Sequence, residues 1–192
     1  MSSIIVAGDT SGSITLQAPA VAGSTVLTLP AVSGTVLTST STQSSFPPNI
    51  AGNGPAFSAY PSASQTLTSS TFTKVQINTE EFDTNSNYDN TTNYRFTPTV
   101  AGYYQVNGTV NVAASTGNTR SIATFYKNGS EFKRGVDTPN NTGTGAVTVS
   151  CIVSMNGTTD YIELYGYIVA TVPVIASGAI STHFSAAMVR SA

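Results

Sequence analysis

Few side chains in the sequence could carry out nucleophilic or acid–base chemistry. His183 is the only histidine and Cys151 is the only cysteine. A Cys–His pair works only when the two side chains are adjacent and a third group orients the base, and no pattern here suggests that arrangement. Cys151 alternates with apolar residues and is predicted to be a small buried residue, and His183 is predicted to lie in the last strand. The sequence therefore predicts that the protein is not an enzyme.

A cluster of carboxylates, Glu80, Glu81 and Asp83, is the remaining candidate for acid–base chemistry. Polysaccharide-cleaving enzymes use two carboxylates about 5–10 Å apart, but this cluster is expected to be a solvated loop edge. Asp83 and Asp89, with neighbouring asparagine oxygens, offer the hard oxygen ligands that calcium prefers. The spacing is not that of an EF-hand loop, so we predict no metal and no cofactor.

A polar loop over residues 83–94 is the best candidate for binding a glycan. Tyrosine rings can stack on sugar faces while amide and carboxylate groups bond to hydroxyls. The predicted receptor-binding residues are Asn85, Asn87, Tyr88, Asp89, Asn93 and Tyr94. The alternative is a polar turn that only connects two strands. Loops 114–120 and 137–145 are secondary candidates, because binding residues concentrate on loops of a rigid scaffold.

The elements that must position these residues are β-strands. Alternating apolar and polar residues predict strands at 14–17, 56–60, 71–77, 94–96, 103–112, 120–127, 131–134, 146–155, 161–169 and 179–190. Turns are predicted at 101–102, 127–130, 142–145 and 156–158, the second and fourth from Asn-Gly pairs. The apolar connection 170–178 is either a contact site or a packed loop. So many strands in one domain predict an all-β fold, a sandwich or a jelly roll.

The composition excludes several classes of protein. Charged residues make up 8% of the 192, with a formal net charge of -2, so no basic patch for nucleic acid is expected. A single cysteine excludes an intrachain disulfide. No apolar run is long enough for membrane insertion, and residues 1–6 do not resemble a secretion signal.

The N-terminal part differs from the rest. Through residue 73 the only charged side chain is Asp9, and residues 19–28 and 30–38 form a repeat of about eleven residues, the length of a short strand and a turn. Its small side chains bury too little area to offset the ordering cost of about 1–2 kcal/mol per residue. We predict an attachment or stalk segment and linker at 1–54 and a head at 55–192. The N-terminal segment is either a flexible tail or a set of strands completed by neighbouring copies of the chain, and the repeat favours the second.

The head resembles the C1q-like domain, the jelly roll that TNF-like cytokines share. The resemblance rests on ordered landmarks at 55–60, 94–106, 127–129, 156–164 and 183–190. Ala186 stands where the family's closing strand usually has glycine, and two residues separate Gly157 from Asp160. The family implies a homotrimer, with Tyr161, Tyr165 and Tyr167, opposite Ile162 and Leu164, as candidate interface residues.

The stretch 14–38 resembles segments of phage tail and fibre proteins. Together the two resemblances imply a virion protein, a phage tail fibre made in the bacterial cytoplasm. Residues near 1–54 would attach to a tail or baseplate protein, and the trimeric head would bind a host surface receptor, a glycan or a protein. The alternatives are a purely architectural trimer, as a capsid decoration or baseplate piece, and a polysaccharide-degrading spike.

Overall fold

The structure is a computed structural model that describes residues 3–7, 11, 13–17, 53–113, 115–138 and 145–192. The chain divides into two compact units, Met1–Ser39 and Thr40–Ala192. In the first unit, β1 (Ser3–Ala7) pairs antiparallel with β2 (Ser13–Gln17). The strand predicted at 14–17 is confirmed, and β1 was not predicted. The repeat and most of the predicted linker lie outside the described residues, so the stalk and the boundary at residue 54 stay predictions.

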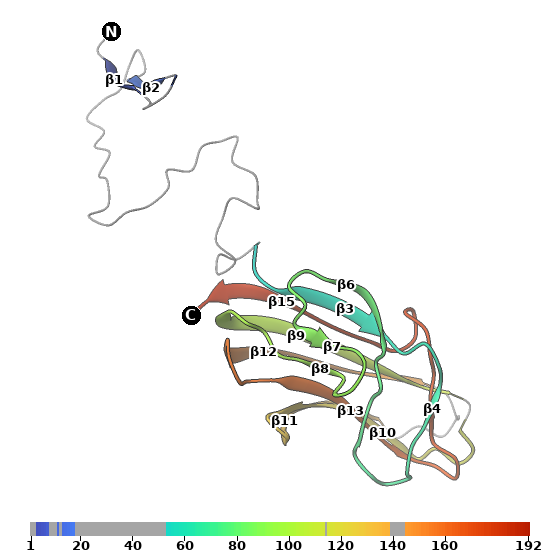
Figure 1. The fold of residues 1–192 in the computed structure, drawn as a ribbon. Coiled ribbons are helices and arrows are strands. Elements are labelled where there is room, and N and C mark those ends of the chain that lie inside the picture. The colour runs from blue at the N-terminus through green and yellow to red at the C-terminus, as the bar shows by residue number, and fades with distance from the viewer. Residues whose placement is uncertain (1–2, 8–10, 12, 18–52, 114, 139–144) are drawn as a thin grey trace. The chain divides into compact units, whose positions relative to one another are not determined.

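The second unit is a sandwich of two antiparallel sheets (Figure 1), as predicted. In the six-stranded sheet the order is β11-β10-β13-β8-β7, and β5 also pairs with β13. Its strands are β5 (Thr73–Lys74), β7 (Tyr88–Asp89), β8 (Arg95–Phe96), β10 (Arg120–Lys127), β11 (Ser130–Thr138) and β13 (Ile162–Val169).

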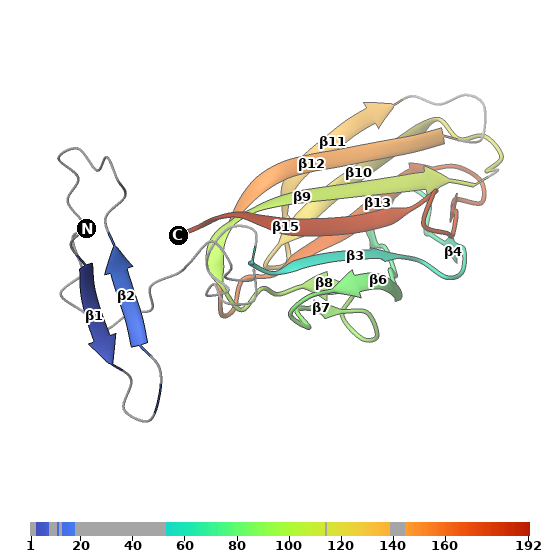
Figure 2. The same cartoon turned by 90° about the horizontal axis from the view of Figure 1, so that it is seen from above.

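The seven-stranded sheet has the order β4-β14-β9-β15-β3-β6, and β12 also pairs with β9. Its strands are β3 (Ala56–Tyr60), β4 (Gln65–Thr66), β6 (Thr79–Asp83), β9 (Ala101–Val112), β12 (Gly145–Asn156), β14 (Val174–Ile175) and β15 (His183–Ser191). Figure 2 shows β3, β15, β9 and β12 side by side in one layer. None of the described residues forms a helix long and apolar enough to span a membrane.

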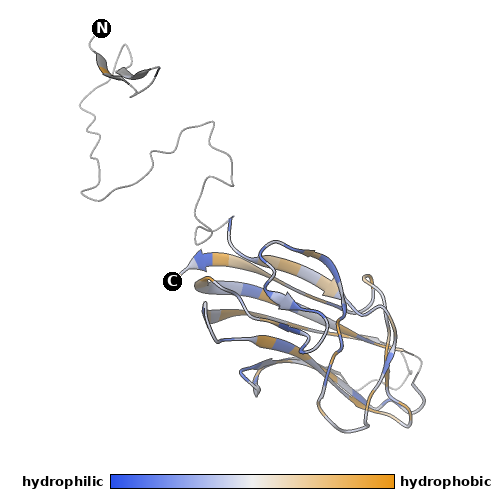
Figure 3. Cartoon of the chain, viewed as in Figure 1, coloured by the Kyte–Doolittle hydropathy of each residue, from blue (hydrophilic) through white to orange (hydrophobic). Residues whose placement is uncertain are grey.

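The core lies between the sheets because the strands alternate in hydropathy (Figure 3). Phe57 stacks on Tyr88 and Phe96, with ring centroids 4.5 and 4.7 Å apart. It also meets Phe184 edge-on at 4.9 Å. Gly108 of β9 lets the sheets approach closely at this point, because a Cβ there would lie 2.7 Å from a methyl carbon of Leu164.

Several predicted boundaries were wrong. Within 71–77 only β5 is a strand, and the strand predicted at 179–190 starts at His183, because the N–H groups of Ser181 and Thr182 donate to the carbonyl of Gly178 in a turn. The turn predicted at 101–102 is the start of β9, which pairs with Asn156 and Met155 of β12. The short strands β4, β7 and β14 were not predicted, since two residues carry no periodicity.

Of the two Asn-Gly turns, the one between β10 and β11 is confirmed most directly. Asn128 and Gly129 both have positive φ, at 52° and 80°, as the tight hairpin turn requires. Gly157 in the second turn has a φ of 72°, and a Cβ there would overlap the backbone nitrogen of Ala101. Glycine is therefore required at residue 157 both by its conformation and by the space around it.

Candidate functional site

The carboxylate cluster was predicted to lie on a loop edge, and this prediction was wrong. Glu80, Glu81 and Asp83 belong to β6, which forms the edge of the seven-stranded sheet beside β3. Edge strands tolerate charged residues because one side of the strand is not paired. Glu81 accepts a hydrogen bond of 2.6 Å from the Ser58 hydroxyl.

The predicted receptor loop uses its acidic groups to hold its own backbone. Asp83 accepts hydrogen bonds from the N–H groups of Asn85 and Tyr88. Asp89 accepts from the N–H groups of Thr91, Thr92 and Asn93, and from the Asn93 side-chain amide. These bonds, with that from Thr92 the strongest, hold the pKa of Asp89 well below its usual range. The oxygens that were considered as calcium ligands are therefore occupied within the loop.

Two further residues of this loop are buried. Tyr88 is 5% exposed, stacks on Phe57, and donates its hydroxyl to the carbonyl of Ile77. Asn87 is 6% exposed, and its side-chain oxygen accepts from the N–H and hydroxyl of Thr99. Neither side chain is placed to meet a sugar.

The surface of the loop is left to Asn85, which is exposed, and to Asn93 and Tyr94, which are half-buried. Tyr94 has a φ of 49°, an uncommon backbone conformation for a side chain of this size. The loop was proposed as a binding site, and in the structure its residues mainly complete a polar turn. No contact with a ligand tests the prediction for Asn85, Asn93 and Tyr94.

Replacing Tyr88 with phenylalanine tests the structural role of this loop. The substitution keeps the stacked ring and leaves the buried carbonyl of Ile77 without its donor, so the free energy of unfolding should fall by about 1–3 kcal/mol. Urea unfolding measures it. Tyr94→Phe is the matched control and should change stability by less than about 0.5 kcal/mol. Equal losses in the two variants would contradict the structural role of the Tyr88 hydroxyl.

His183 and Cys151 do not approach each other as a nucleophile pair would. His183 Nε2 lies 3.1 Å from Thr109 Oγ1 on the neighbouring strand β9, and its Nδ1 is buried without a partner among the described residues. Cys151 is on β12, half-buried against the core, and burial raises the pKa of its thiol. A raised pKa disfavours the reactive thiolate. Among the described residues, no three His, Cys, Asp or Glu side chains are grouped to hold a metal ion.

The three tyrosines predicted at a trimer interface contact side chains of their own chain. Tyr165 stacks on Tyr126 with centroids 3.9 Å apart. Tyr167 lies 4.8 Å from the ring of Phe72, and the Arg95 guanidinium covers Tyr161 at 4.3 Å. All three side chains are half-buried, and the interface assignment stays a prediction.

Tyr165 and Tyr167 belong to a second cluster, outside the main core, that the sequence did not reveal. We name it the outer cluster, and it consists of Phe72, Ile122, Thr124, Tyr126, Tyr165 and Tyr167. Phe72 comes from the segment before β5 and packs on the outer side of β10 and β13. Ile122 and Thr124, on the outward side of β10, are 1% and 0% exposed. The Thr124 hydroxyl bonds to Glu131 and to the carbonyl of Lys133, both on the neighbouring strand β11.

Charged groups border the outer cluster. Glu163 is 3% exposed and pairs with Lys74 at 2.5 Å. Arg134 forms a two-pronged pair with Glu131, both contacts being 2.8 Å long, and lies 5.2 Å from the centre of the Phe72 ring. Burial raises the pKa of Tyr165 to about 12, with the Glu163 charge adding to the effect.

The outward side of the seven-stranded sheet has the opposite character. We call it the uncharged face, formed by the outward residues of β12 (Ala146, Thr148, Ser150, Ile152, Ser154, Asn156), β9 (Tyr103, Gln105, Asn107, Thr109, Asn111) and β15 (His183, Ser185, Ala187, Val189). These residues include no Asp, Glu, Lys or Arg. The charged residues of this side lie at its border, where Arg190 pairs with Tyr103 and Glu81 bonds to Ser58 of β3. The polar groups of the uncharged face bond to one another. Gln105 donates a hydrogen bond to Ser150, and Ser150 donates one to Asn107, and both bonds are 2.8 Å long.

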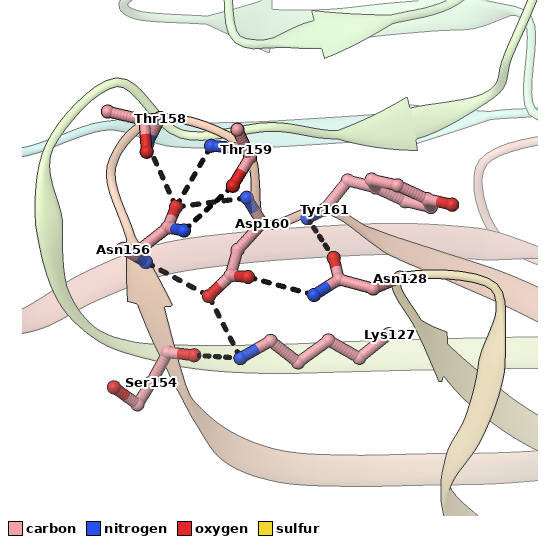
Figure 4. Close-up of polar contacts among 8 residues, drawn as sticks. All are labelled: Lys127, Asn128, Ser154, Asn156, Thr158, Thr159, Asp160 and Tyr161. Atoms are coloured by element: carbon pink, nitrogen blue, oxygen red, sulfur yellow. Dashed lines mark hydrogen bonds and ion pairs between the residues drawn. The ribbon is translucent and has the colours of Figure 1, made fainter.

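The landmarks at 127–129 and 156–164 meet in one hydrogen-bonded network (Figure 4). The Asn156 side-chain oxygen accepts the N–H groups of Thr158, Thr159 and Asp160. Asp160 accepts from Asn128 at 2.8 Å and pairs with Lys127 at 3.0 Å. Figure 4 shows the two turns joined through these side chains, so these landmark residues fix the end of the sandwich.

Replacing Asp160 with asparagine should lower the free energy of unfolding by about 1–2 kcal/mol at pH 7, because it removes the charge that Lys127 and Asn128 contact. These contacts, the Asn128 hydrogen bond first, hold the pKa of Asp160 below its usual range. A carboxylate with a depressed pKa contributes its full stability above the unfolded-state pKa of about 4, and this contribution is lost as the pH falls from there through the lower folded-state pKa. The difference between wild type and variant should therefore shrink below about pH 4.

Glu80→Gln is the control, because the pKa of Glu80 is shifted in the opposite direction to that of Asp160. Burial raises the pKa of Glu80, with Asp83 adding to the effect, so its charge is not stabilising at pH 7 and the variant should be as stable as the wild type or slightly more so. Thermal unfolding between pH 3 and 7 measures the stabilities. An equal loss of stability in Asp160→Asn at every pH would contradict the stabilising role of the Asp160 charge.

The apolar connection 170–178 is partly packed and partly exposed. Ile175 is buried and its strand, β14, pairs with β4 and β9, whereas Val172 is 54% exposed. The packed alternative therefore holds for Ile175, and the contact-site prediction for the remainder is untested.

Similar solved structures define the class of fold. The chain is similar to murine APRIL (TM-score 0.52, 10% identity, covering 70% of this chain and 98% of that one). It is also similar to the globular domain of the zebrafish complement 1qA protein (TM-score 0.52, 13% identity, 72% and 99% covered). A third is Eiger TNF from S. frugiperda (TM-score 0.53, 7% identity, 71% and 93% covered).

The head therefore has the C1q/TNF-like jelly-roll fold, as the landmarks implied. At these identities the likeness shows the fold alone. No protein-family model matches the chain, and no curated protein sequence matches it either.

Proposed function

We propose that the chain forms a homotrimer that acts as a phage tail fibre, attached through residues near 1–54 and binding a host surface receptor with its heads. The C1q/TNF-like fold supports the first part, because domains of this fold are typically trimeric binding domains and not enzymes. The likeness of residues 14–38 to tail-fibre segments supports the second.

The proposal of a trimer rests mainly on the uncharged face. The centres of protein interfaces are depleted in charged residues, and three long neighbouring strands here present none until Arg190. Exposed apolar side chains lie on the same face: Tyr103, Ile152 and Val189 are 42%, 58% and 46% exposed. Ile152 is on the strand beside Gln105, and Tyr103 is two residues away along β9.

The polar groups of this face are suited to burial against another copy. Gln105, Asn107 and Ser150 already satisfy one another, so covering them leaves few unpaired donors. The tyrosine side of the six-stranded sheet carries Lys74, Glu163, Arg120 and Arg134, which would be costly to desolvate. We therefore place the trimer contact on the uncharged face in preference to Tyr161, Tyr165 and Tyr167.

Adsorption of the labelled full chain to whole bacterial cells tests the receptor role. The proposal expects saturable binding to the host, lost when residues 55–192 are deleted. Labelling of the particle should place the protein at the tail. Absence of binding to host cells would favour the architectural trimer, and release of reducing sugars from the host envelope would favour the degrading spike.

A further inference from the structure

Three connections at one end of the head carry no charged side chain. We name this part the distal end, and it consists of residues 61–70, 115–119 and 170–182, whose sequences contain no Asp, Glu, Lys or Arg. Arg120 and Asp137 border it, on β10 and β11. Figure 2 shows these connections at the opposite end of the sandwich from the start of β3 and the end of β15. The N-terminal segment joins the head at β3, so the distal end lies away from that junction.

The turn that carries Ile180 is fixed by backbone hydrogen bonds. The N–H groups of Ser181 and Thr182 donate to the carbonyl of Gly178, and the N–H of Gly178 donates to the carbonyl of Pro61 over 2.9 Å. Gly178 has a φ of 98°, a conformation that suits glycine. Ile180 is nevertheless 99% exposed, more than any other large apolar side chain among the described residues. Because the turn is already fixed, little further backbone entropy is lost when Ile180 enters a partner.

Val172 is held out in the same way by the neighbouring connection. The N–H of Thr171 donates to the carbonyl of Thr116 over 3.0 Å, and the carbonyl of Pro173 accepts from the N–H of Leu67 over 2.9 Å. Val172, between these two bonded residues, is 54% exposed. Single exposed aliphatic side chains are common on proteins, but two of them on fixed connections at one uncharged end indicate a contact surface.

The chemistry of the distal end selects one class of partner. None of its residues is aromatic, so it offers no ring on which a sugar could stack. It has no basic side chain to hold the phosphates of an anionic membrane surface. Exposed aliphatic side chains gain free energy by leaving water for an apolar pocket, and the centres of protein interfaces are depleted in charged residues. A protein surface therefore fits the distal end better than a glycan or a lipid.

We propose that the distal end binds a protein of the host cell surface, with Ile180 and Val172 as its apolar anchors. This inference rests on the proposed receptor role and gives it a site and a class of partner. It assigns a contact role to the exposed part of the connection 170–178. Thr171, Ser177 and Ser181 flank the anchors in sequence and supply the uncharged polar groups of an interface rim.

Adsorption of the labelled full chain to host cells tests the site. Ile180→Asp and Val172→Asp put a charge on each anchor and should each weaken adsorption about tenfold or more, whereas Ile180→Leu should stay within about threefold of the wild type. Ser130→Asp adds the same charge at the start of β11, at the opposite end of the sandwich, and should change nothing. All three positions are exposed, so the variants should fold, and circular dichroism checks that they do. A loss in Ser130→Asp as large as in Ile180→Asp would overturn the assignment.

Treatment of the cells tests the class of partner. Adsorption should be lost after protease digestion of the cell surface and should survive periodate oxidation of its glycans. Vesicles of phosphatidylethanolamine and phosphatidylglycerol should not bind the chain. Loss of adsorption after periodate alone would assign the binding to a glycan, and binding to the vesicles would assign it to lipid. Either result would overturn the protein proposal.

The same adsorption measurement separates this proposal from the receptor role. If the wild type adsorbs and Ile180→Asp and Val172→Asp adsorb equally well, the receptor role stands and the distal end is the wrong site. If the wild type does not adsorb at all, the receptor role itself is wrong.

Discussion

Replacing Ser150 with arginine is expected to convert the trimer into monomers. Ser150 lies on β12 at the centre of the uncharged face, beside Gln105 and Asn107. In a trimer packed through this face, each copy would bury a guanidinium with no acidic partner. An uncompensated buried charge costs about 3–5 kcal/mol, so association should weaken by more than about a hundredfold. Analytical ultracentrifugation measures the change.

The matched control is Ser130→Arg, which adds the same charge at an exposed position of β11, on the other sheet. It should leave association unchanged. Both side chains are exposed in the single chain, so both variants should fold, and circular dichroism checks that they do. If Ser130→Arg dissociated the protein and Ser150→Arg did not, the interface would lie on the six-stranded sheet, as first predicted for Tyr161, Tyr165 and Tyr167.

Gly135→Ala should produce the largest loss of stability. Gly135 is on β11 of the six-stranded sheet, where it passes close to β12 of the other sheet. A Cβ at residue 135 would overlap the carbonyl oxygen of Thr148 and lie 2.8 Å from the Cα of Val149. Both are backbone atoms, so no side chain can rotate to relieve the overlap, and the free energy of unfolding should fall by about 3 kcal/mol or more.

Urea unfolding of Gly135→Ala measures this effect, and Ser130→Ala on the same strand is its control. The control removes one exposed hydroxyl and should change stability by less than about 0.5 kcal/mol. A fully stable Gly135→Ala protein would mean that β11 and β12 are farther apart than the structure places them.

The sequence predicted the fold wherever a local signal was strong. The alternation through 103–112 and 146–155 identified β9 and β12, the two longest strands. Asn128-Gly129 and Asn156-Gly157 identified two turns from backbone conformations that glycine and asparagine tolerate best. The landmarks near these turns were informative because Lys127, Asn128, Asn156 and Asp160 bond to one another in the structure.

The candidate site was less predictable because it depends on tertiary burial. Loop 83–94 looks uniformly polar, yet Tyr88 occupies the core beside Phe57, and Asn87 bonds to Thr99 twelve residues away. Polar composition predicts a loop surface, but it does not reveal which polar groups are already used. Glu163 lies on the same side of β13 as the tyrosines, yet it is 3% exposed, and its ion pair with Lys74 offsets the cost of burying the charge.

The outer cluster and the uncharged face also lay beyond sequence reasoning. Alternation separates the two sides of a strand, but it does not say which sheet a strand joins. Only the observed order of β12, β9 and β15 brings their uncharged sides together. Likewise, Phe72 packs on Tyr126 and Tyr167 from a segment that lies far away in the sequence, a contact that no local pattern encodes.

The mass of the purified full chain in solution tests the central claim most directly. Sedimentation equilibrium at micromolar concentration should return three times the 19.8 kDa of one chain, with no dependence on the loading concentration. A single species at the mass of one chain, folded and unchanged as the concentration rises, would contradict the homotrimer and with it the role of the uncharged face.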